Sequence, residues 1–267
     1  MLKLHSTTGQ HQKVPIEGVS LLSILHMVMP WLLIVRTERV SEPDILKLKG
    51  FLSEVEIAKS ERFHYQKDRQ SYIIVHGLIR WISGNLLGME PKAIRIDYNA
   101  YGKPFIPNNT GNIFFNVSHS SGASVLAFDQ GHEIGADIEK IDPDFDFQPI
   151  IQRFFTEKEN RFINEPGKQS SHRFYKLWTR KEAFLKALAI GITENLDVEV
   201  FRRRNYLDLK DKRNDGIRSN DFLLKTMSFR NEYILSIASK SVPGKINAYL
   251  LEEGFPTDPE PDKVEYD

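Results

Sequence analysis

The 267-residue chain contains no cysteine. It therefore offers no disulfide framework, no thiolate nucleophile and no cysteine-ligated zinc or iron–sulfur site, and nothing points to an oxidising compartment. The sequence also lacks an excess of charge of one sign, because 36 basic residues balance 36 acidic residues. A general nucleic-acid-binding protein is expected to show a clear basic excess. The composition thus argues against thiol chemistry and against general nucleic-acid binding.

Long apolar runs are also scarce. The longest, Val19 to Val35, contains His26 and Pro30 and lacks a small-residue cleavage site. It is shorter than the roughly 20 apolar residues that span a membrane. We therefore predict a cytoplasmic protein with no membrane segment, and we interpret Trp31 to Val35 as an early buried strand.

The neutral total hides an uneven distribution of charge. Residues 252–267 contain seven acids, one base and three prolines, so this tail carries a net charge of −6 and the rest of the chain +6. Such a composition predicts a disordered acidic tail. Residues 1–20 are predicted to form a polar N-terminal extension. The basic excess of the body suits a polyanionic ligand and an acidic partner.

The hydrophobic pattern of the body predicts an α+β fold. Ser53 and Glu56 have the spacing of a helix capping box, and apolar residues then recur at helical spacing from Tyr72 to Ile82. Three short apolar runs separated by turn residues follow, and we interpret them as an antiparallel meander. These runs are residues 112–117, 123–128 and 133–139.

Helices followed by strands appear a second time in the C-terminal part of the chain. Helices are expected over 148–155, 156–163 and 172–188, and strands over 233–238 and 245–250. The repeated order predicts two similar α/β halves, each a helix layer with an antiparallel sheet. We assign residues 21–130 to the first half and residues 131–251 to the second, with a boundary near Gly131.

One predicted strand carries two acids on one face. Residues 134–139 alternate between apolar side chains and Gly135, Asp137 and Glu139, so a strand would place the two carboxylates side by side. Such carboxylates repel each other unless a cation lies between them. With room left for water and phosphate, they favour Mg²⁺ over a closed calcium site. The alternative is an exposed edge strand whose acids are solvated or paired with Lys140.

A second candidate lies in the long C-terminal helix. Glu182 and Lys186 are four residues apart and project from one helix face. Glu182 could be a third metal carboxylate, and Lys186 could be a point charge for a phosphate. The alternative is an ordinary surface ion pair.

A third candidate follows an apolar strand. The segment Phe115 to Ser121 ends in small hydroxyl residues and His119, where free backbone N–H groups could help to bind a phosphate. The turn Gly102-Lys103-Pro104 precedes it. The alternative is a polar turn between strands, and a Ser/His/Asp triad is a poor interpretation because no strong acid motif accompanies Ser118 and His119.

Taken in order, these motifs resemble the 4′-phosphopantetheinyl transferase superfamily, in its larger single-chain type that activates polyketide and nonribosomal-peptide synthases. The resemblance covers about Trp31 to Leu251, and the ordered set is far more specific than any one motif. The matching segments are Gly102-Lys103-Pro104, Asn116-Val117-Ser118-His119-Ser120, Gly135-Ala136-Asp137-Ile138-Glu139, Phe154-Phe155 with Glu159, and Trp178 to Ala187. Two positions depart from the family pattern without removing a ligand. Ala136 replaces the usual Ile or Val, and Ala189 replaces the first of two glycines.

The resemblance implies an enzyme of the holo-[acyl-carrier-protein] synthase type. It would transfer the phosphopantetheine arm of coenzyme A to a serine of an apo acyl or peptidyl carrier protein, with Mg²⁺, and release adenosine 3′,5′-bisphosphate. It also implies two halves related by a pseudo-twofold axis, with coenzyme A and metal in the cleft between them. A chain that carries both halves is expected to work as a monomer. The carrier could belong to a polyketide, nonribosomal-peptide or fatty-acid system.

Residue roles follow from the resemblance. The implied magnesium ligands are Asp137, Glu139 and Glu182, and Lys186 matches the lysine that contacts the pyrophosphate. The residues implied to contact coenzyme A are Arg62, Arg69, Lys103, Pro104, Ser118 and His119, together with Asp137 and Lys186. Glu159 matches a glutamate proposed as general base, although Thr156 and Glu159 also have capping-box spacing. Glu182 is the other candidate for the base.

Two other functional classes stay open at this point. The carboxylates alone would suit a different Mg²⁺-dependent phosphoryl or nucleotidyl transferase, although the chain has no P-loop and no kinase motif set. The second class is a module that binds coenzyme A or a carrier protein without catalysis. The intact Asp137, Glu139, Glu182 and Lys186 argue against it.

Overall fold

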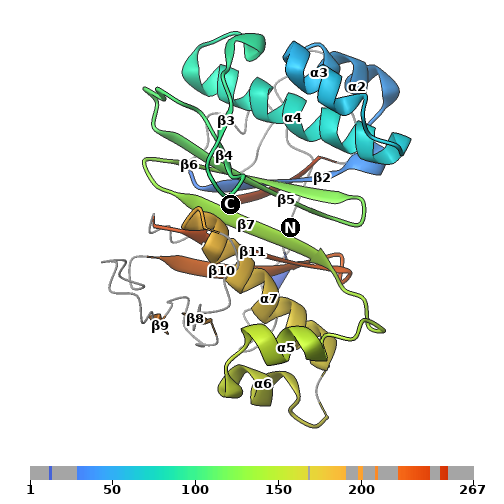
Figure 1. Ribbon diagram of the computed structural model, residues 1–267, viewed down its shortest axis with the longest axis vertical. Helices are drawn as coiled ribbons and strands as arrows, with labels where there is room; N and C mark the ends of the chain where they lie inside the picture. The colour runs from blue at the N-terminus through green and yellow to red at the C-terminus, as the bar shows by residue number, and fades with distance from the viewer. Residues whose placement is uncertain are drawn as a thin grey trace, which may run out of the picture.

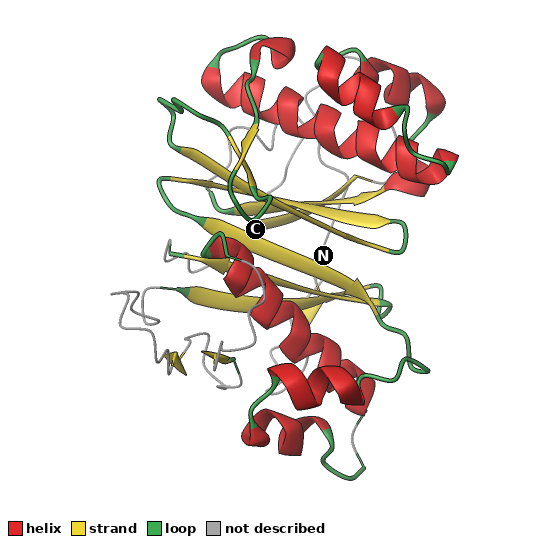
Figure 2. Cartoon of the chain, viewed as in Figure 1, coloured by secondary structure: helices red, strands yellow, loops and turns green. Residues whose placement is uncertain are grey.

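The computed structural model describes residues 12–13, 29–167, 169–190, 198–200, 208–209, 222–240 and 247–251. These residues form four layers, with one group of helices, two sheets and a second group of helices stacked in that order (Figures 1 and 2). The acidic tail and most of the N-terminal extension lie outside the described residues. None of the helices in the described part of the chain has both the length and the apolar composition of a membrane-spanning helix.

The first helical layer covers a four-stranded sheet. The helices are α2 (Glu42–Lys49), α3 (Glu54–Ser60) and α4 (Gln66–Leu87). The strand order is β12 (Asn247–Leu251), β2 (Trp31–Arg36), β6 (Ala123–Gln130) and β5 (Ile113–Ser120). The predicted buried strand at Trp31 is confirmed as β2. The predicted capping box is also confirmed, because Ser53 caps α3 and Glu56 bonds back to the Ser53 backbone.

The second helical layer covers a second four-stranded sheet. The strand order is β1 (Gln12–Lys13), β10 (Leu223–Phe229), β11 (Tyr233–Ser239) and β7 (Ile134–Lys140). The helices are α5 (Gln148–Phe154), α6 (Glu157–Ile163) and α7 (Ser170–Ala187). The remaining short elements are η1 (Thr37–Arg39), η2 (Pro91–Ala93), β3 (Asp97–Tyr98), β4 (Pro104–Phe105), β8 (Val198–Glu199) and β9 (Asp208–Leu209).

Three apolar cores hold the layers together. The first lies between the first helices and their sheet and includes Trp31, Leu78 and Phe128. The second lies under α7 and contains Phe174 and Phe184 among its buried aromatic residues. The third core lies between the two sheets. It contains every second residue of β2 from one sheet and every second residue of β7 and β11 from the other. Because apolar burial is the main favourable term in folding, these shared cores fix how the two sheets face each other.

The topology differs from the sequence-based prediction in two strands. The hairpin of β5 and β6 is confirmed, but β7 does not continue that meander and instead lies at the edge of the other sheet. The reason is that β6 is already hydrogen-bonded on both sides, by β2 and by β5. The C-terminal strand β12, which was predicted to belong to the second half, pairs with β2 of the first sheet. The boundary of the halves near Gly131 stays a prediction.

The last turn of α7 contains a strained alanine. Ala189 has a φ of 57°, in the left-handed region that favours glycine. Its N–H bonds to Lys186 O at 3.2 Å, and Ile190 N–H bonds to Leu185 O at 3.1 Å, so the helix ends in a Schellman motif.

Replacement of this alanine should stabilise the protein. A left-handed conformation costs a non-glycine residue roughly 1–2 kcal/mol, so we expect Ala189→Gly to raise the free energy of unfolding by about 1 kcal/mol. Ala187→Gly, inside the same helix, is the control and should lower it by about 1 kcal/mol. Urea denaturation of both variants measures the difference, and a loss of stability in Ala189→Gly would contradict the strain assignment.

Candidate active site

The site lies where the edge strands of the two sheets meet. β5 and β7 run in the same direction but belong to different sheets. Alternate side chains of β5, rather than its backbone, form hydrogen bonds to β7. Asn116 Oδ1 accepts a hydrogen bond from Ala136 N at 2.9 Å, and Ser118 Oγ donates one to Asp137 Oδ1 at 2.7 Å. Ser120 Oγ donates to Glu139 Oε2 at 2.8 Å and accepts from Lys140 N at 3.1 Å. These bridges hold both strand carboxylates in place.

Gly135 brings α7 directly onto β7. A Cβ atom at this position would lie 2.0 Å from Ala183 O and 2.3 Å from Ala187 N, both in the helix backbone. No side chain other than hydrogen fits such a distance. The close approach places Lys186, one residue before Ala187, over the polar face of β7.

Asp137 is the centre of the site. It is 3% exposed, and its Oδ1 accepts hydrogen bonds from Ser118 and from Lys186 Nζ, the latter at 2.6 Å. Its Oδ2 is buried and has no hydrogen-bond partner. Burial raises the pKa of Asp137, although the Lys186 charge and the Ser118 hydroxyl oppose that rise. Half of a buried carboxylate is therefore left without the donor or cation that its charge requires.

Two further carboxylates, those of Glu139 and Glu182, are affected by the charge of Asp137. Burial and then the charge of Asp137 raise the pKa of Glu139. Burial raises the pKa of Glu182 to about 7, with Asp137 and Glu139 adding to the rise and Lys186 opposing it. Three acids thus face one lysine. Among the described residues, no three His, Asp or Glu side chains are close enough together to hold one metal ion as they stand.

The raised pKa of Glu182 predicts that this site destabilises the protein as the pH rises. The folded state binds a proton at Glu182 up to about pH 7, whereas the unfolded state releases it near pH 4.5. The stabilisation is therefore complete below about pH 4.5 and lost as the pH approaches 7. We expect the site to contribute about 1–3 kcal/mol less stability at pH 8 than at pH 5. Urea denaturation measures this slope, which Glu182→Gln should flatten, and an unchanged slope in that variant would contradict the shift.

Glu159 lies in a different environment. It is fully buried, and the predicted capping box is confirmed, since Thr156 N donates to Glu159 Oε2 at 2.9 Å. The same oxygen lies 2.9 Å from Lys181 Nζ, and Oε1 accepts from Val200 N at 2.9 Å. Both oxygens are thus engaged by donors that bind helix α6 to α7 and to residue 200. This geometry favours the structural alternative, and the role of general base stays a prediction.

The Gly-Lys-Pro turn is tied to the start of β7. Lys103 Nζ lies 2.6 Å from Glu133 Oε2 and donates to Ile134 O at 3.2 Å, and Pro104 begins the short strand β4. Burial lowers the pKa of Lys103, with Glu133 opposing the change. The predicted contact of this turn with coenzyme A is therefore compatible with its position beside the site, but Lys103 has a protein partner as well.

The other predicted coenzyme A residues lie farther out. His119 is exposed, and since neighbouring residues of a strand face opposite ways, it points away from the side on which Ser118 meets Asp137. Arg62 follows α3 and Arg69 lies in α4, both exposed in the first half. Within the described part of the chain, no hydrogen bond or ion pair joins either arginine to the carboxylates.

Sequence reasoning missed the bridging role of Asn116 and Ser120. The signal was present, because Asn116, Ser118 and Ser120 are alternate polar residues of one strand and must share a face. What the signal could not give was the partner strand, which comes from the other sheet.

Comparison with known proteins identifies the family. Residues 133–238 match the family model described as "4′-phosphopantetheinyl transferase superfamily", and residues 39–131 match "4′-phosphopantetheinyl transferase, N-terminal". The chain is 32% identical to 4′-phosphopantetheinyl transferase HetI of Nostoc sp. over 162 residues, which are 60% of this chain and 68% of the relative.

Two relatives from Bacillus subtilis agree. A 4′-phosphopantetheinyl transferase is 32% identical over 183 residues, 68% of this chain and 79% of its own length. The 4′-phosphopantetheinyl transferase Sfp of strain 168 is 31% identical over 160 residues, 59% of this chain and 69% of its own. The chain therefore belongs to the 4′-phosphopantetheinyl transferase superfamily, in its larger Sfp-like type.

Proposed function

We propose that the protein transfers the 4′-phosphopantetheine group of coenzyme A to a serine hydroxyl of an apo acyl or peptidyl carrier protein. In this reaction the serine oxygen forms a bond to the β-phosphorus, and the bond from that phosphorus to the bridging oxygen breaks. The serine proton passes to a base, and adenosine 3′,5′-bisphosphate leaves with the bridging oxygen. The observation that carries the proposal is the carboxylate cluster beside Lys186, in a chain of this family.

The cluster fits a divalent metal. Asp137 Oδ2 is buried without a partner, and two more carboxylates with raised pKa values lie in the same field. A hard divalent cation would satisfy these oxygens, and Mg²⁺ suits a site that also leaves room for water and phosphate. Asp137, Glu139 and Glu182 would hold it after their side chains move closer together. When bound, Mg²⁺ would neutralise the charge that develops on the pyrophosphate.

The protein's own groups have separate tasks. Lys186 would bind a pyrophosphate oxygen, because its ammonium group already lies at the polar face of β7 with a side chain that is 28% exposed. Ser118 and Ser120 would keep the two strand carboxylates in position. The base that takes the serine proton would be Glu182 or a water beside it. Glu159 is the less suitable candidate, since all its oxygens have donors.

Glu159→Gln separates a structural role from a catalytic one. Glutamine keeps one acceptor oxygen but removes the charge that faces Lys181, so we expect the free energy of unfolding to fall by about 2 kcal/mol. The kcat of the folded protein should fall less than about tenfold, since no proton transfer is lost. Steady-state transfer assays and urea denaturation measure the two effects. A kcat loss of about 10³-fold with little change in stability would restore Glu159 as the base.

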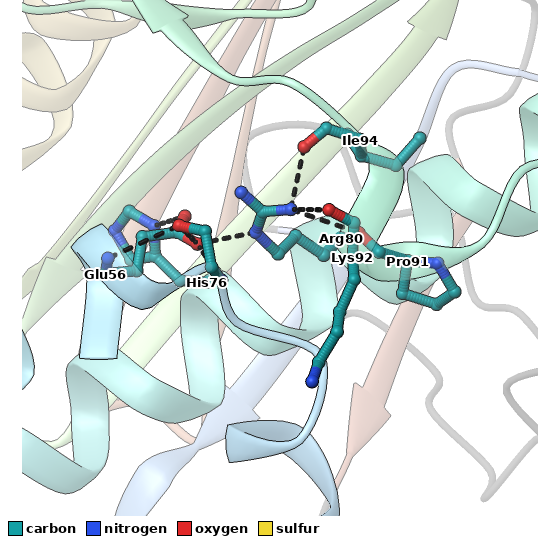
Figure 3. A network of polar contacts seen from close by, with 7 residues as sticks. Glu56, His76, Arg80, Pro91, Lys92 and Ile94 are labelled. Atoms are coloured by element: carbon teal, nitrogen blue, oxygen red, sulfur yellow. Dashed lines mark hydrogen bonds and ion pairs between the residues drawn. The ribbon is translucent and has the colours of Figure 1, made fainter.

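We also propose that the two halves are related by a pseudo-twofold axis. In the first half Glu56 closes a capping box on α3 and lies 2.6 Å from Arg80 Nε of the long helix α4 (Figure 3). In the second half Glu159 closes a capping box on α6 and lies 2.9 Å from Lys181 of the long helix α7. The same device in the same order supports a duplicated unit. A chain with both halves would complete its site as a monomer.

The direct test is product formation. The purified protein should release adenosine 3′,5′-bisphosphate from coenzyme A only when Mg²⁺ and an apo carrier are both present, as measured by chromatography. Release without a carrier would favour a different phosphoryl transferase. Binding of coenzyme A without release, with several carriers, would favour a binding module.

A further inference from the structure

The segment from Pro91 to Phe105 lies between α4 and β5 in the chain, within the first half, and it contacts the end of α7 in the second half. Its first part is fixed by Arg80, a buried residue of α4, whose NH1 donates to Pro91 O, Lys92 O and Ile94 O at 3.1, 3.2 and 2.7 Å (Figure 3). Glu56 holds Arg80 in turn. Burial opposes the ionisation of Glu56, but hydrogen bonds from His76 and Ser53 and the charge of Arg80 outweigh it and lower its pKa to about 2. The start of the segment is therefore fixed to α4.

A lysine holds the middle of the segment against the same helices. Lys59 Nζ lies 5.7 Å from the centre of the Tyr98 ring and 5.3 Å from that of Tyr72 in α4. Both are cation–π distances. The residue that follows Tyr98 is therefore presented at a defined place beside the second half.

That residue, Asn99, makes contacts in two directions. Its Nδ2 donates to Ala189 O at 3.0 Å, at the end of α7. Its Oδ1 accepts from Tyr101 N and from Lys103 N, each at 2.9 Å, which shapes the turn that contains Gly102 and Lys103. One side chain thus joins the turn to the end of the helix that carries Glu182 and Lys186.

We propose that Asn99 is a positioning residue that sets the distance between the Gly-Lys-Pro turn and Lys186. The proposal rests on the proposed function, in which Lys186 contacts the pyrophosphate of coenzyme A, and on the predicted contact of the Gly-Lys-Pro turn with the same molecule. Ala189 follows Lys186 by three residues, and its N–H bonds to Lys186 O, so the end that Asn99 holds is the last turn around Lys186. Coenzyme A would then be gripped at two points of fixed separation.

The chemistry requires asparagine in particular. The contact to Ala189 O needs a donor, and the contacts to the turn need an acceptor, and the carboxamide of asparagine supplies these on two separate atoms of one short side chain. Aspartate keeps the acceptor but presents a carboxylate to the Ala189 carbonyl. Alanine removes both contacts.

The test compares Asn99→Asp and Asn99→Ala with a matched control. Asn85→Ala removes an exposed asparagine of α4 whose Nδ2 donates a hydrogen bond within its own helix, to Trp81 O. We expect both Asn99 variants to raise the KM for coenzyme A and the Kd for adenosine 3′,5′-bisphosphate about tenfold, since each loses the link to α7. The kcat and the KM for the carrier should stay within about twofold, and Asn85→Ala should match the wild type.

Two results would overturn the proposal. One is a KM for coenzyme A within about twofold of the wild type in both Asn99 variants. The other is full rescue in Asn99→Asp, which would mean that the shape of the turn matters and the link to α7 does not. Failure of the proposed function can be distinguished from failure of the Asn99 proposal. In that case the wild-type protein itself would transfer nothing to any apo carrier.

Discussion

Gly135→Ala should prevent α7 from lying on β7. A methyl group at this position would be 2.0 Å from Ala183 O and 2.3 Å from Ala187 N, so two backbones rather than a movable side chain would have to separate. Overpacking of this kind exceeds the usual 1–3 kcal/mol, and we expect a loss of about 4 kcal/mol or more in the free energy of unfolding. Transfer activity should disappear, because Lys186 and Glu182 move away with the helix. Denaturant titration and circular dichroism measure the loss.

Gly131→Ala is the matched control for this change. Gly131 has a φ of 88° but no atom within 4 Å of its would-be Cβ, so the variant carries backbone strain without a collision. Its cost should be about 1–2 kcal/mol, and its activity should persist. Gly135 has no such positive φ, so a loss in Gly135→Ala no larger than that in Gly131→Ala would contradict the collision between β7 and α7.

Asp137→Asn should abolish transfer and leave a folded protein. Asparagine keeps the shape and an acceptor for Ser118 but removes the charge that faces Lys186 and the proposed metal. We expect kcat to fall by about 10³-fold, the scale that follows loss of one group that stabilises charge in a transition state. Stability should change by less than about 1 kcal/mol, because the carboxylate is poorly solvated in the wild type.

A second buried aspartate tests the specificity of that loss. Asp129 is 1% exposed and accepts hydrogen bonds from Ser239 Oγ and Gln130 N, away from the carboxylate cluster. Asp129→Asn should lower stability and leave kcat within about threefold of the wild type. Near-normal turnover in Asp137→Asn would refute the metal assignment, whatever the control does.

The parts of the fold that depend on local sequence were predictable. The capping boxes at Ser53 and Thr156 use contacts three residues apart, and the buried strand β2 is a continuous apolar run. Strand pairing was not predictable in the same way. The edge on which β7 lies depends on β6 being occupied on both sides, which involves residues far apart in the chain.

The candidate site likewise has features that could be predicted from local sequence and features that could not. The shared face of Asp137 and Glu139 follows from the period of a strand, and the spacing of Glu182 and Lys186 follows from that of a helix. That these two elements touch depends on Gly135, whose role appears only when α7 is placed on β7. Likewise, Oε1 of Glu159 accepts a hydrogen bond from Val200 N, which lies 41 residues along the chain.

The mass of an apo carrier protein shows whether this chain loads it with phosphopantetheine. Apo carriers from polyketide, nonribosomal-peptide and fatty-acid systems would be incubated with the protein, coenzyme A and Mg²⁺, and analysed intact by mass spectrometry. We predict that at least one carrier gains the mass of one phosphopantetheine arm, and that a chelator or replacement of the acceptor serine by alanine prevents the gain. If the folded wild-type protein leaves the mass of all these carriers unchanged, the proposed transfer to carrier proteins is wrong.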